Sequence, residues 1–344
     1  MSLRIKVRIN MLQILECVPN VSEGRDISII TGIEDSIRNI KDVTLLHTDT
    51  GKAANRTVFT FAGSPEAVVE AAFQMSRTAA RLIDMRHHSG EHPRIGAVDV
   101  LPLVPVKGIM MNEAVSYSRR LALRIGEELA IPVYCYEYSA FSEKRKKLED
   151  CRAGEYEGLA TKMTLPDWKP DYGPGTFNSK SGATIVGARN LLVAYNINLN
   201  TSSVQIAKSI ASEVRESGKV ITESGGIRKR IPGSLKSVKA IGWFIAEYGC
   251  AQVSMNLTDM SVTPVHKAFD EVSKAAGKYN VEVTGSEVIG LISLQAMLDA
   301  GKYYSREKNE TDQYYIMEAI SSLGLNQLYK FLPEEKIIEY KLKL

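Results

Sequence analysis

The order of strand-like and helix-like segments constrains this chain most, because the same order occurs twice. Residues 13–106 alternate as strand, helix, strand, strand, helix, strand, which is the β-α-β-β-α-β pattern of a ferredoxin-like unit. The second helix begins at Ser64-Pro65, a good N-cap followed by the residue suited to the first helical position, and Thr263-Pro264 opens a helix of the second half in the same way. We therefore expect an α+β fold of two ferredoxin-like subdomains, residues 1–190 and 191–344, packed with a ligand cleft between them.

Hydrophobic periodicity places the individual elements. It predicts strands at residues 13–19, 42–49, 56–62, 98–106, 133–137, 190–199, 235–246, 250–258 and 287–293, and helices at 27–40, 112–130, 141–150, 201–216 and from residues 64 and 263 onward. Thr201 or Ser202 is the expected N-cap of the helix at 201–216. Pro102 and Pro105 make 98–106 an edge strand, because proline cannot donate to a sheet ladder. One proline has an even and the other an odd position, so their missing N–H groups fall on opposite sides of the strand and cannot both face outward. We therefore expect one of them at a bulge or at the strand end.

Two stretches are predicted to be loops. Residues 164–182 are rich in proline and glycine, and a loop of this length is usually functional or disordered. Its aromatic residues, Trp168, Tyr172 and Phe177, argue against disorder. Residues 222–234 contain a run of three basic residues, which predicts a basic loop that is either a solvated surface or a contact for an anionic ligand.

Composition excludes several classes of protein. Hydrophobic residues make up 44% of the chain and the net charge is only +3, so most of the chain is not disordered. A net charge this small does not indicate nucleic-acid binding. The chain has no run of about 18 apolar residues, so no membrane span is predicted. Residues 1–10 are basic but lack the apolar core of a secretory signal, and the four cysteines form no CxxC pair. We expect a cytoplasmic protein with neither a nucleic acid nor a membrane as partner.

The densest polar cluster lies at residues 84–99 and holds three of the five histidines. His88 and His92 have the spacing of metal ligands on a helix, but Gly90 and Pro93 disfavour a continuous helix there, so we expect no metal. A charged surface loop without a role is a second interpretation. The third is a site for acid/base chemistry and anion binding, in which His92 transfers protons near neutrality and Arg94 makes a bidentate contact with a carboxylate.

The chain also resembles a known family, the formiminotransferase family, from about residue 13 to 341. The matching motifs are residues 16–25 (ECVPNVSEGR), 55–57 (NRT), 90–100 (GEHPRIGAVDV), 132–134 (PVY), 152–157 (RAGEYE), 171–174 (DYGP), 182–184 (GAT), 187–189 (GAR), 194–199 (AYNINL), 240–243 (AIGW) and 252–257 (QVSMNL). They occur in the family's order, which makes the resemblance specific.

The resemblance implies a homodimer that moves the formimino group of N-formimino-L-glutamate to N5 of tetrahydrofolate, in histidine breakdown and one-carbon metabolism. It implies two ferredoxin-like subdomains with the substrate site between them, and a catalytic histidine at His92. It also implies no cyclodeaminase domain, because the chain ends at Leu344. The segment that it implies for folate binding is Gly173, Pro174, Gly175, Thr176, Phe177, Asn178, Ser179, Lys180, Ser181 and Gly182.

The expected chemistry needs one group that moves two protons. N5 attacks the formimino carbon, N5 must lose its proton, and the glutamate nitrogen must leave protonated, so a group of pKa near 7 such as His92 can serve both steps. Asp49 is a candidate to orient His92, or an ordinary residue flanking a turn. Asn55 and Arg56 either position the substrate or have structural roles, and Arg94 is expected to hold a substrate carboxylate.

Three other functions remain open at this point. The first is glutamate formyltransferase chemistry with 5-formyltetrahydrofolate, since formyl and formimino differ only by O against NH. The second is a metal-dependent hydrolase that uses His87, His88 and His92. The third is a folate-binding protein without turnover.

Overall fold

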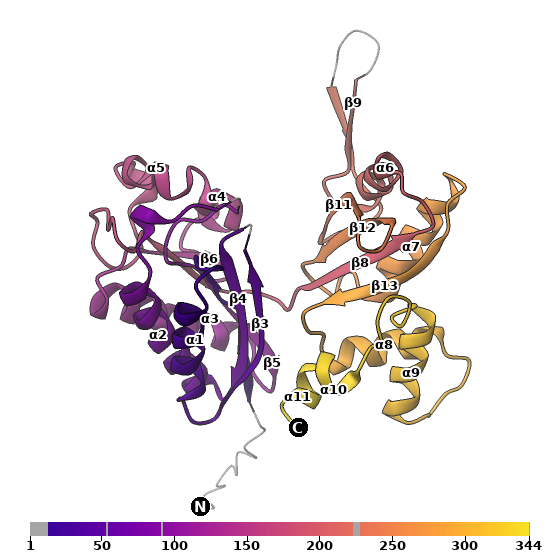
Figure 1. Ribbon diagram of the computed structural model, residues 1–344, viewed down its shortest axis with the longest axis horizontal. Coiled ribbons are helices and arrows are strands. Elements are labelled where there is room, and N and C mark those ends of the chain that lie inside the picture. Colours follow the sequence, from indigo (N-terminus) through magenta and orange to yellow (C-terminus); the bar gives the residue numbers. More distant parts are fainter. Residues whose placement is uncertain (1–12, 53, 91, 223–227, 344) are drawn as a thin grey trace, which may run out of the picture. The chain divides into compact units, whose positions relative to one another are not determined.

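The computed structural model describes residues 13–343, apart from residues 53, 91 and 223–227. Contacts divide the chain into two compact units, unit 1 (Met1–Asn190) and unit 2 (Leu191–Leu344). Each unit is a mixed α+β structure in which helices pack against a sheet (Figure 1). In the ranges given above, no helix combines the length and the apolar character needed to cross a membrane.

Unit 1 is built on a seven-stranded sheet. Its strands are β1 (Ile14–Cys17), β2 (Asn20–Val21), β3 (Val43–Gly51), β4 (Arg56–Gly63), β5 (Val98–Lys107), β6 (Val133–Glu137) and β7 (Thr184–Ala188). The order across the sheet is β3, β4, then β1 and β2 end to end, then β5, β7 and β6. β7 pairs in parallel with β5 and with β6, whereas the other pairs are antiparallel.

Three helices cover one face of this sheet: α1 (Ile27–Arg38), α2 (Pro65–Leu82) and α3 (Met111–Glu128) (Figure 1). Their apolar stripes, such as Ile33 of α1 and Leu121 of α3, are fully buried against the strands. A second, smaller core joins α5 (Glu155–Lys162) to alternate residues of β5, β6 and β7. α4 (Leu148–Arg152) precedes α5, and three single 3₁₀ turns lie at Met85–His87, Glu143–Arg145 and Pro166–Trp168. The site described below lies where α5 meets the start of β5.

The expectation that residues 98–106 form an edge strand is wrong. β5 lies inside the sheet, because β7 pairs with it on the side away from β1 and β2. The two prolines are accommodated by breaks in the pairing. The carbonyl of Pro102 accepts from Val18, which lies between β1 and β2, and Pro105 lies at a register shift opposite Leu15. The prediction of one proline at a bulge is therefore confirmed.

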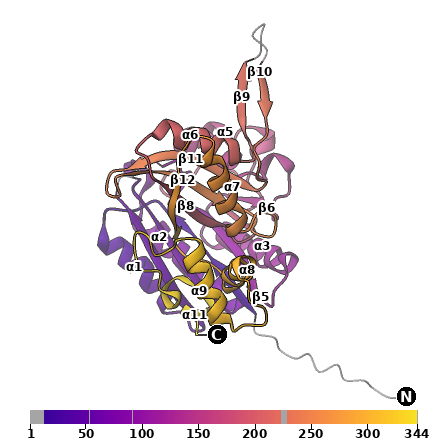
Figure 2. The same ribbon diagram turned by 90° about the vertical axis from the view of Figure 1, so that its right-hand side faces the viewer.

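Unit 2 is built on a four-stranded antiparallel sheet. Its strands are β8 (Val193–Leu199), β11 (Val238–Ile245), β12 (Cys250–Leu257) and β13 (Val283–Ile289), in the order β11, β12, β8, β13. α6 (Val204–Val214) and α7 (Val265–Gly277) lie across one face of the sheet (Figure 2). Four further helices, none of them predicted, follow β13: α8 (Leu294–Tyr304), α9 (Asp312–Ser322), α10 (Pro333–Lys336) and α11 (Ile338–Lys341).

Three local expectations need correction. Residues 141–150 do not form one helix, because the carbonyl of Lys146 accepts from Glu137 at the end of β6 instead of from a helical N–H. The N-cap of α6 is Ser203, whose side chain accepts from Ile206 at 3.3 Å. The basic run at 228–230 is not in a loop: β9 (Lys219–Thr222) and β10 (Arg228–Ile231) form an antiparallel hairpin that projects beyond α6 (Figure 2). The rest of that predicted loop, residues 223–227, lies outside the described residues.

Candidate active site

Asn55 lies in the turn directly before β4, whose first residue is Arg56. Its φ of 47° is left-handed, a conformation that asparagine tolerates better than most residues. Its Oδ1 accepts from Gly24 N and its Nδ2 donates to Ser89 O, both at 3.0 Å. Asn55 therefore joins three separate segments, and the amide that was expected to position substrate is used within the chain.

His92 lies in the loop that leads into β5, and both of its ring nitrogens are engaged. Nδ1 lies 2.7 Å from the carbonyl of Pro93. A carbonyl can only accept, so Nδ1 carries the proton and Nε2 presents its lone pair, which accepts from Nη1 of Arg56. Burial, together with the positive charges of Arg56 and Arg152, lowers the pKa of His92 to about 4. The ring is therefore neutral at neutral pH, with the lone pair of Nε2 directed at Arg56.

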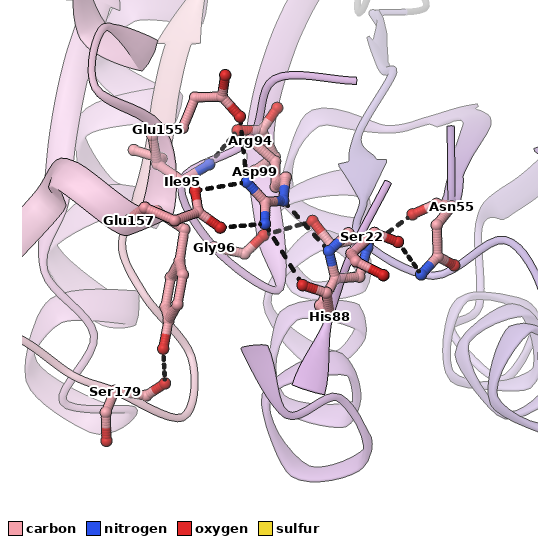
Figure 3. Close-up of polar contacts among 12 residues, drawn as sticks. Ser22, Asn55, His88, Arg94, Ile95, Gly96, Asp99, Glu155, Glu157 and Ser179 are labelled. Atoms are coloured by element: carbon pink, nitrogen blue, oxygen red, sulfur yellow. Dashed lines mark hydrogen bonds and ion pairs between the residues drawn. The ribbon is translucent and has the colours of Figure 1, made fainter. Parts of the chain in front are cut away.

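Arg94 is almost completely buried, with 6% of its surface exposed, and its guanidinium is fully used within the chain. Nη1 lies 3.1 Å from Glu155 and 2.8 Å from Glu157, and Nη2 lies 2.6 Å from the other oxygen of Glu157. Nε donates to Nδ1 of His88 at 3.2 Å, and Nη2 also reaches the carbonyl of His88 (Figure 3). These five contacts match the five N–H groups of arginine. Arg94 thus holds the loop to α5 and presents no free donor to the carboxylate it was expected to bind.

His88 is a structural partner of these groups. Its Nε2 lies 2.8 Å from the carbonyl of Asn55, so Nε2 is the protonated nitrogen and Nδ1 accepts from Arg94. Burial lowers the pKa of His88 as well. Both nitrogens are occupied, which leaves His88 unsuited to the metal-ligand role considered above. Over the described ranges, no three His, Cys, Asp or Glu side chains come together as metal ligands would.

Asp99 and Arg152 were quoted in sequence motifs but were not predicted as site residues. Asp99 is buried at the start of β5, where it accepts from Ile95 N at 3.0 Å and from Nη2 of Arg152. Arg152 ends α4, and its charge acts on both Arg56 and His92. No local pattern predicts this pair, because its members lie 53 residues apart.

These groups surround a depression that is too narrow in this conformation to hold a water molecule, and its lining includes Asn55, Arg56, His88, His92 and Asp99. Asp49 was expected to orient His92, but it is exposed on β3 and the orienting acceptor is Pro93. Burial and the charge of Arg152 lower the pKa of Arg56, while Asp99 and, less strongly, Asp49 oppose this lowering.

Residues 173–182, the segment predicted to bind folate, lie beside the loop that carries His92. Ser181 O accepts from Ala97 N at 2.8 Å, and Ala183 N donates to Ile95 O at 3.0 Å. Gly182 has a φ of +67°, and a Cβ at this position would lie 2.1 Å from Ile95 O. Glycine is thus required for this close approach.

α5 joins this segment to the Arg94 cluster. Tyr156 N donates to Arg94 O at 2.8 Å, and the Tyr156 hydroxyl donates to Ser179 O at 2.5 Å (Figure 3). The rings of Tyr156 and Phe177 are 5.5 Å apart. One helix therefore positions both the loop of His92 and the segment predicted to bind folate.

A neutral histidine flanked by guanidinium groups is an arrangement whose chemistry suits proton transfer on an anionic molecule. Comparison with known proteins gives the family. The N-terminal subdomain of the formiminotransferase domain matches residues 14–189, and the formiminotransferase domain matches residues 194–343. The chain belongs to the formiminotransferase family.

Named relatives agree with this assignment. The glutamate formimidoyltransferase of Streptococcus pyogenes serotype M1 is 41% identical over 86% of this chain and 94% of its own length. That of Thermoplasma acidophilum is 40% identical over 89% of this chain and 97% of its own length. The formimidoyltransferase-cyclodeaminase of Dictyostelium discoideum is 45% identical over 96% of this chain, which spans only 60% of that longer protein.

Proposed function

We propose that this protein transfers the formimino group of N-formimino-L-glutamate to N5 of tetrahydrofolate, with His92 as the general acid/base. The observation that carries the proposal is the neutral His92 ring, held by Pro93 and Arg56 next to residues 173–182. Membership of the formiminotransferase family and the names of the two short relatives support the choice of substrates.

We also propose that each unit is a ferredoxin-like subdomain. In unit 2 the strands lie in the order second, third, first, fourth of a β-α-β-β-α-β series. In unit 1, β3, β4, the β1–β2 pair and β5 follow the same order, and β7 and β6 extend the sheet beyond β5. The repeated order supports two copies of one supersecondary unit, with the boundary near residue 190.

In the proposed reaction, N5 of tetrahydrofolate attacks the formimino carbon and forms a tetrahedral intermediate. Nε2 of His92 takes the proton that N5 loses, and then gives it to the glutamate nitrogen as the C–N bond breaks. The products are 5-formiminotetrahydrofolate and glutamate, so the histidine ends in the neutral state in which it began.

Arg56 couples substrate binding to this proton transfer. In the free protein its cation lies on Nε2 and lowers the pKa of His92, which keeps the ring neutral but weakens it as a base. A substrate carboxylate that draws Arg56 away from the ring also removes this repulsion, so the pKa of His92 rises toward its ordinary value of about 6.5. Arg56 is therefore our candidate for the carboxylate contact, with Asp49 as its counter-charge.

Asn55 and Arg94 act as positioning residues in this scheme, because their hydrogen bonds fix the turn before β4 and the loop of His92. Residues 173–182 supply the binding segment for tetrahydrofolate. Their backbone is tied to residues 85 and 95–97, so a folate bound there lies close to the catalytic loop.

The test is a turnover assay on the purified protein, read out by the mass of the folate product. Tetrahydrofolate with N-formimino-L-glutamate should give the 5-formimino product. A protein that is active only with 5-formyltetrahydrofolate and glutamate would move the function to formyl transfer, and binding without turnover in either assay would contradict catalysis.

A further inference from the structure

Arg152, the last residue of α4, brings a second guanidinium to the candidate active site. Its Nη2 donates to Oδ2 of Asp99, whose other oxygen accepts from Ile95 N at 3.0 Å (Figure 3). Asp99 lines the same depression as Arg56 and His92. The charge of Arg152 acts on both of those residues, so its guanidinium lies close to them. The reaction proposed above assigns Arg152 no role.

Lys162 of α5 holds the backbone of Arg152 in place. Its Nζ donates to the carbonyls of Asp150 and Cys151 at 2.8 Å and of Ala153 at 3.0 Å, which flank Arg152 in the chain. These bonds use all three donors of the ammonium. Lys162 is only 9% exposed, and burying a cation is costly unless it is fully paired. A buried lysine thus fixes the end of α4 from both sides of Arg152.

The guanidinium of Arg152 keeps a donor that the rest of the chain does not use. Its Nε is buried and has no hydrogen-bond partner among the described residues. Buried polar groups are normally paired, so this exception calls for an explanation. Arg94 is the opposite case, because its five N–H groups are all bonded within the chain. Of these two arginines, Arg152 is the one with a donor left for a ligand.

The charges around the depression favour an anion. Burial raises the pKa of Asp99, and the guanidiniums of Arg152 and Arg56 both act against this rise. The two cations also repel each other, since the charge of Arg152 lowers the pKa of Arg56. A carboxylate that enters between them relieves this repulsion. N-formimino-L-glutamate carries two carboxylates, one for each guanidinium.

We propose that Arg152 binds the side-chain carboxylate of N-formimino-L-glutamate and makes the site specific for a glutamate-derived donor, while Arg56 takes the α-carboxylate. The inference rests on the proposed function. The α-carboxylate is attached to the carbon that bears the reacting nitrogen, so it falls to Arg56, which touches Nε2 of His92. The side-chain carboxylate lies at the far end of the donor and falls to Arg152, which is anchored on Asp99. Movement of Arg56 off His92, which the proposed reaction already requires, opens the depression to both carboxylates.

The experiment measures kcat/KM of the full chain, as wild type and as Arg152→Gln, with three formimino donors. These are N-formimino-L-glutamate, N-formimino-L-glutamine, in which the side-chain carboxylate is an amide, and N-formimino-L-isoglutamine, in which the α-carboxylate is an amide. With the glutamate and isoglutamine donors, Arg152→Gln should lower kcat/KM by about ten- to a hundredfold, mainly through KM, the usual range for a hydrogen bond to a charged group. With the glutamine donor it should cost less than about threefold, because that donor already lacks the contact.

Equal loss with all three donors overturns the inference, because Arg152 would then act on His92 or on the fold instead of on one carboxylate. A loss that disappears with the isoglutamine donor also overturns it, since Arg152 would then serve the α-carboxylate. The donors are compared within each variant, so a change in the pKa of His92 or in the amount of folded protein cancels.

Arg152→Lys keeps a cation for Asp99 but loses the planar fork, so it should show a smaller loss with the same dependence on the donor. It replaces Arg152→Gln in the comparison if the glutamine variant does not fold. Lys147→Gln is the matched control, since it removes an exposed cation directly before α4 and should keep the wild-type kcat/KM with every donor.

Wild-type turnover separates this inference from the proposed function. A wild type that turns over N-formimino-L-glutamate, together with an Arg152→Gln protein equally active on all three donors, refutes the carboxylate contact and leaves the proposed function standing. A wild type without turnover on any donor refutes the proposed function and the contact together.

Discussion

Arg56 donates through Nη1 to Nε2 of His92, so the first residue of β4 holds the ring of a histidine 36 positions later in the chain. The contact places a cation on the nitrogen that is proposed to exchange protons with substrate. Together with the carbonyl of Pro93 on Nδ1, it fixes the tautomer and the orientation of the ring. The free protein therefore holds the His92 ring neutral, and in the proposed mechanism a rise of its pKa depends on what happens to Arg56.

Replacing His92 by alanine should lower kcat for formimino transfer by about 10²- to 10⁴-fold, the usual contribution of acid/base catalysis. Binding of 5-formyltetrahydrofolate should be nearly retained, because residues 173–182 are unchanged. Steady-state kinetics and calorimetry measure the two effects. The matched control is His87→Ala, an exposed histidine of the same region, which should keep the wild-type rate. A His92→Ala protein with normal kcat would remove His92 from the mechanism.

The pH profile should show the effect of Arg56. A base with a pKa of about 4 loses activity only as pH falls through that value, so kcat/KM of the wild type should stay level from neutrality to about pH 5. In Arg56→Gln the cation is gone, the pKa of His92 rises, and the acidic limb should move toward higher pH. NMR titration of the His92 ring measures the same shift directly. An unchanged His92 pKa in Arg56→Gln would show that burial and Arg152 depress it without Arg56.

Replacing Arg94 by alanine should lower the free energy of unfolding by about 2–3 kcal/mol. This is less than a fully buried ion pair would lose, because the side chains of Glu155 and Glu157 are 44% and 63% exposed. Arg94→Lys should lie between wild type and alanine, since an ammonium has three donors without the planar fork. Denaturant titration gives the values. Wild-type stability together with a raised KM for formiminoglutamate would instead support the carboxylate contact expected from sequence.

Gly182→Ala should destabilise the protein by about 1–3 kcal/mol, because the new Cβ meets Ile95 O and the backbone is left-handed there. Gly175→Ala is the matched control within the same segment, since a Cβ at that position has no heavy atom within 4 Å. Thermal unfolding of the two variants compares them. Equal stability of both would mean that residues 181–183 can move away from Ile95 without loss.

Much of the fold could be predicted because its signals are local. Apolar periodicity and the Ser64-Pro65 and Thr263-Pro264 starts placed α2, α7 and most strands close to their observed positions. The position of β5 within the sheet could not be predicted in this way. It depends on β7, a five-residue strand whose pairing with Pro102 and its neighbours involves residues more than 80 positions away. The four helices after β13 were not predicted.

Several residues of the candidate site were selected from sequence, and their roles stay predictions. His92 was selected because of the family motif and the unusual backbone of Gly90 and Pro93, and the structure places Arg56 against it. Arg94 shows the limit of this reasoning. Its type and position suggested a ligand contact, but Glu155 and Glu157 occupy it from 61 and 63 residues away.

The sequence by itself determined the mixed α+β class of the fold and the family, because these depend on residue order and on motifs that are local in the chain. It also selects His92, whose catalytic role stays a prediction. Tertiary structure alone decided which partner each polar group meets: Pro93 and Arg56 for His92, the two glutamates for Arg94, and Asp99 for Arg152. Hydrogen bonds and pKa values depend on distances of a few ångströms between residues far apart in sequence. Only the folded chain sets those distances.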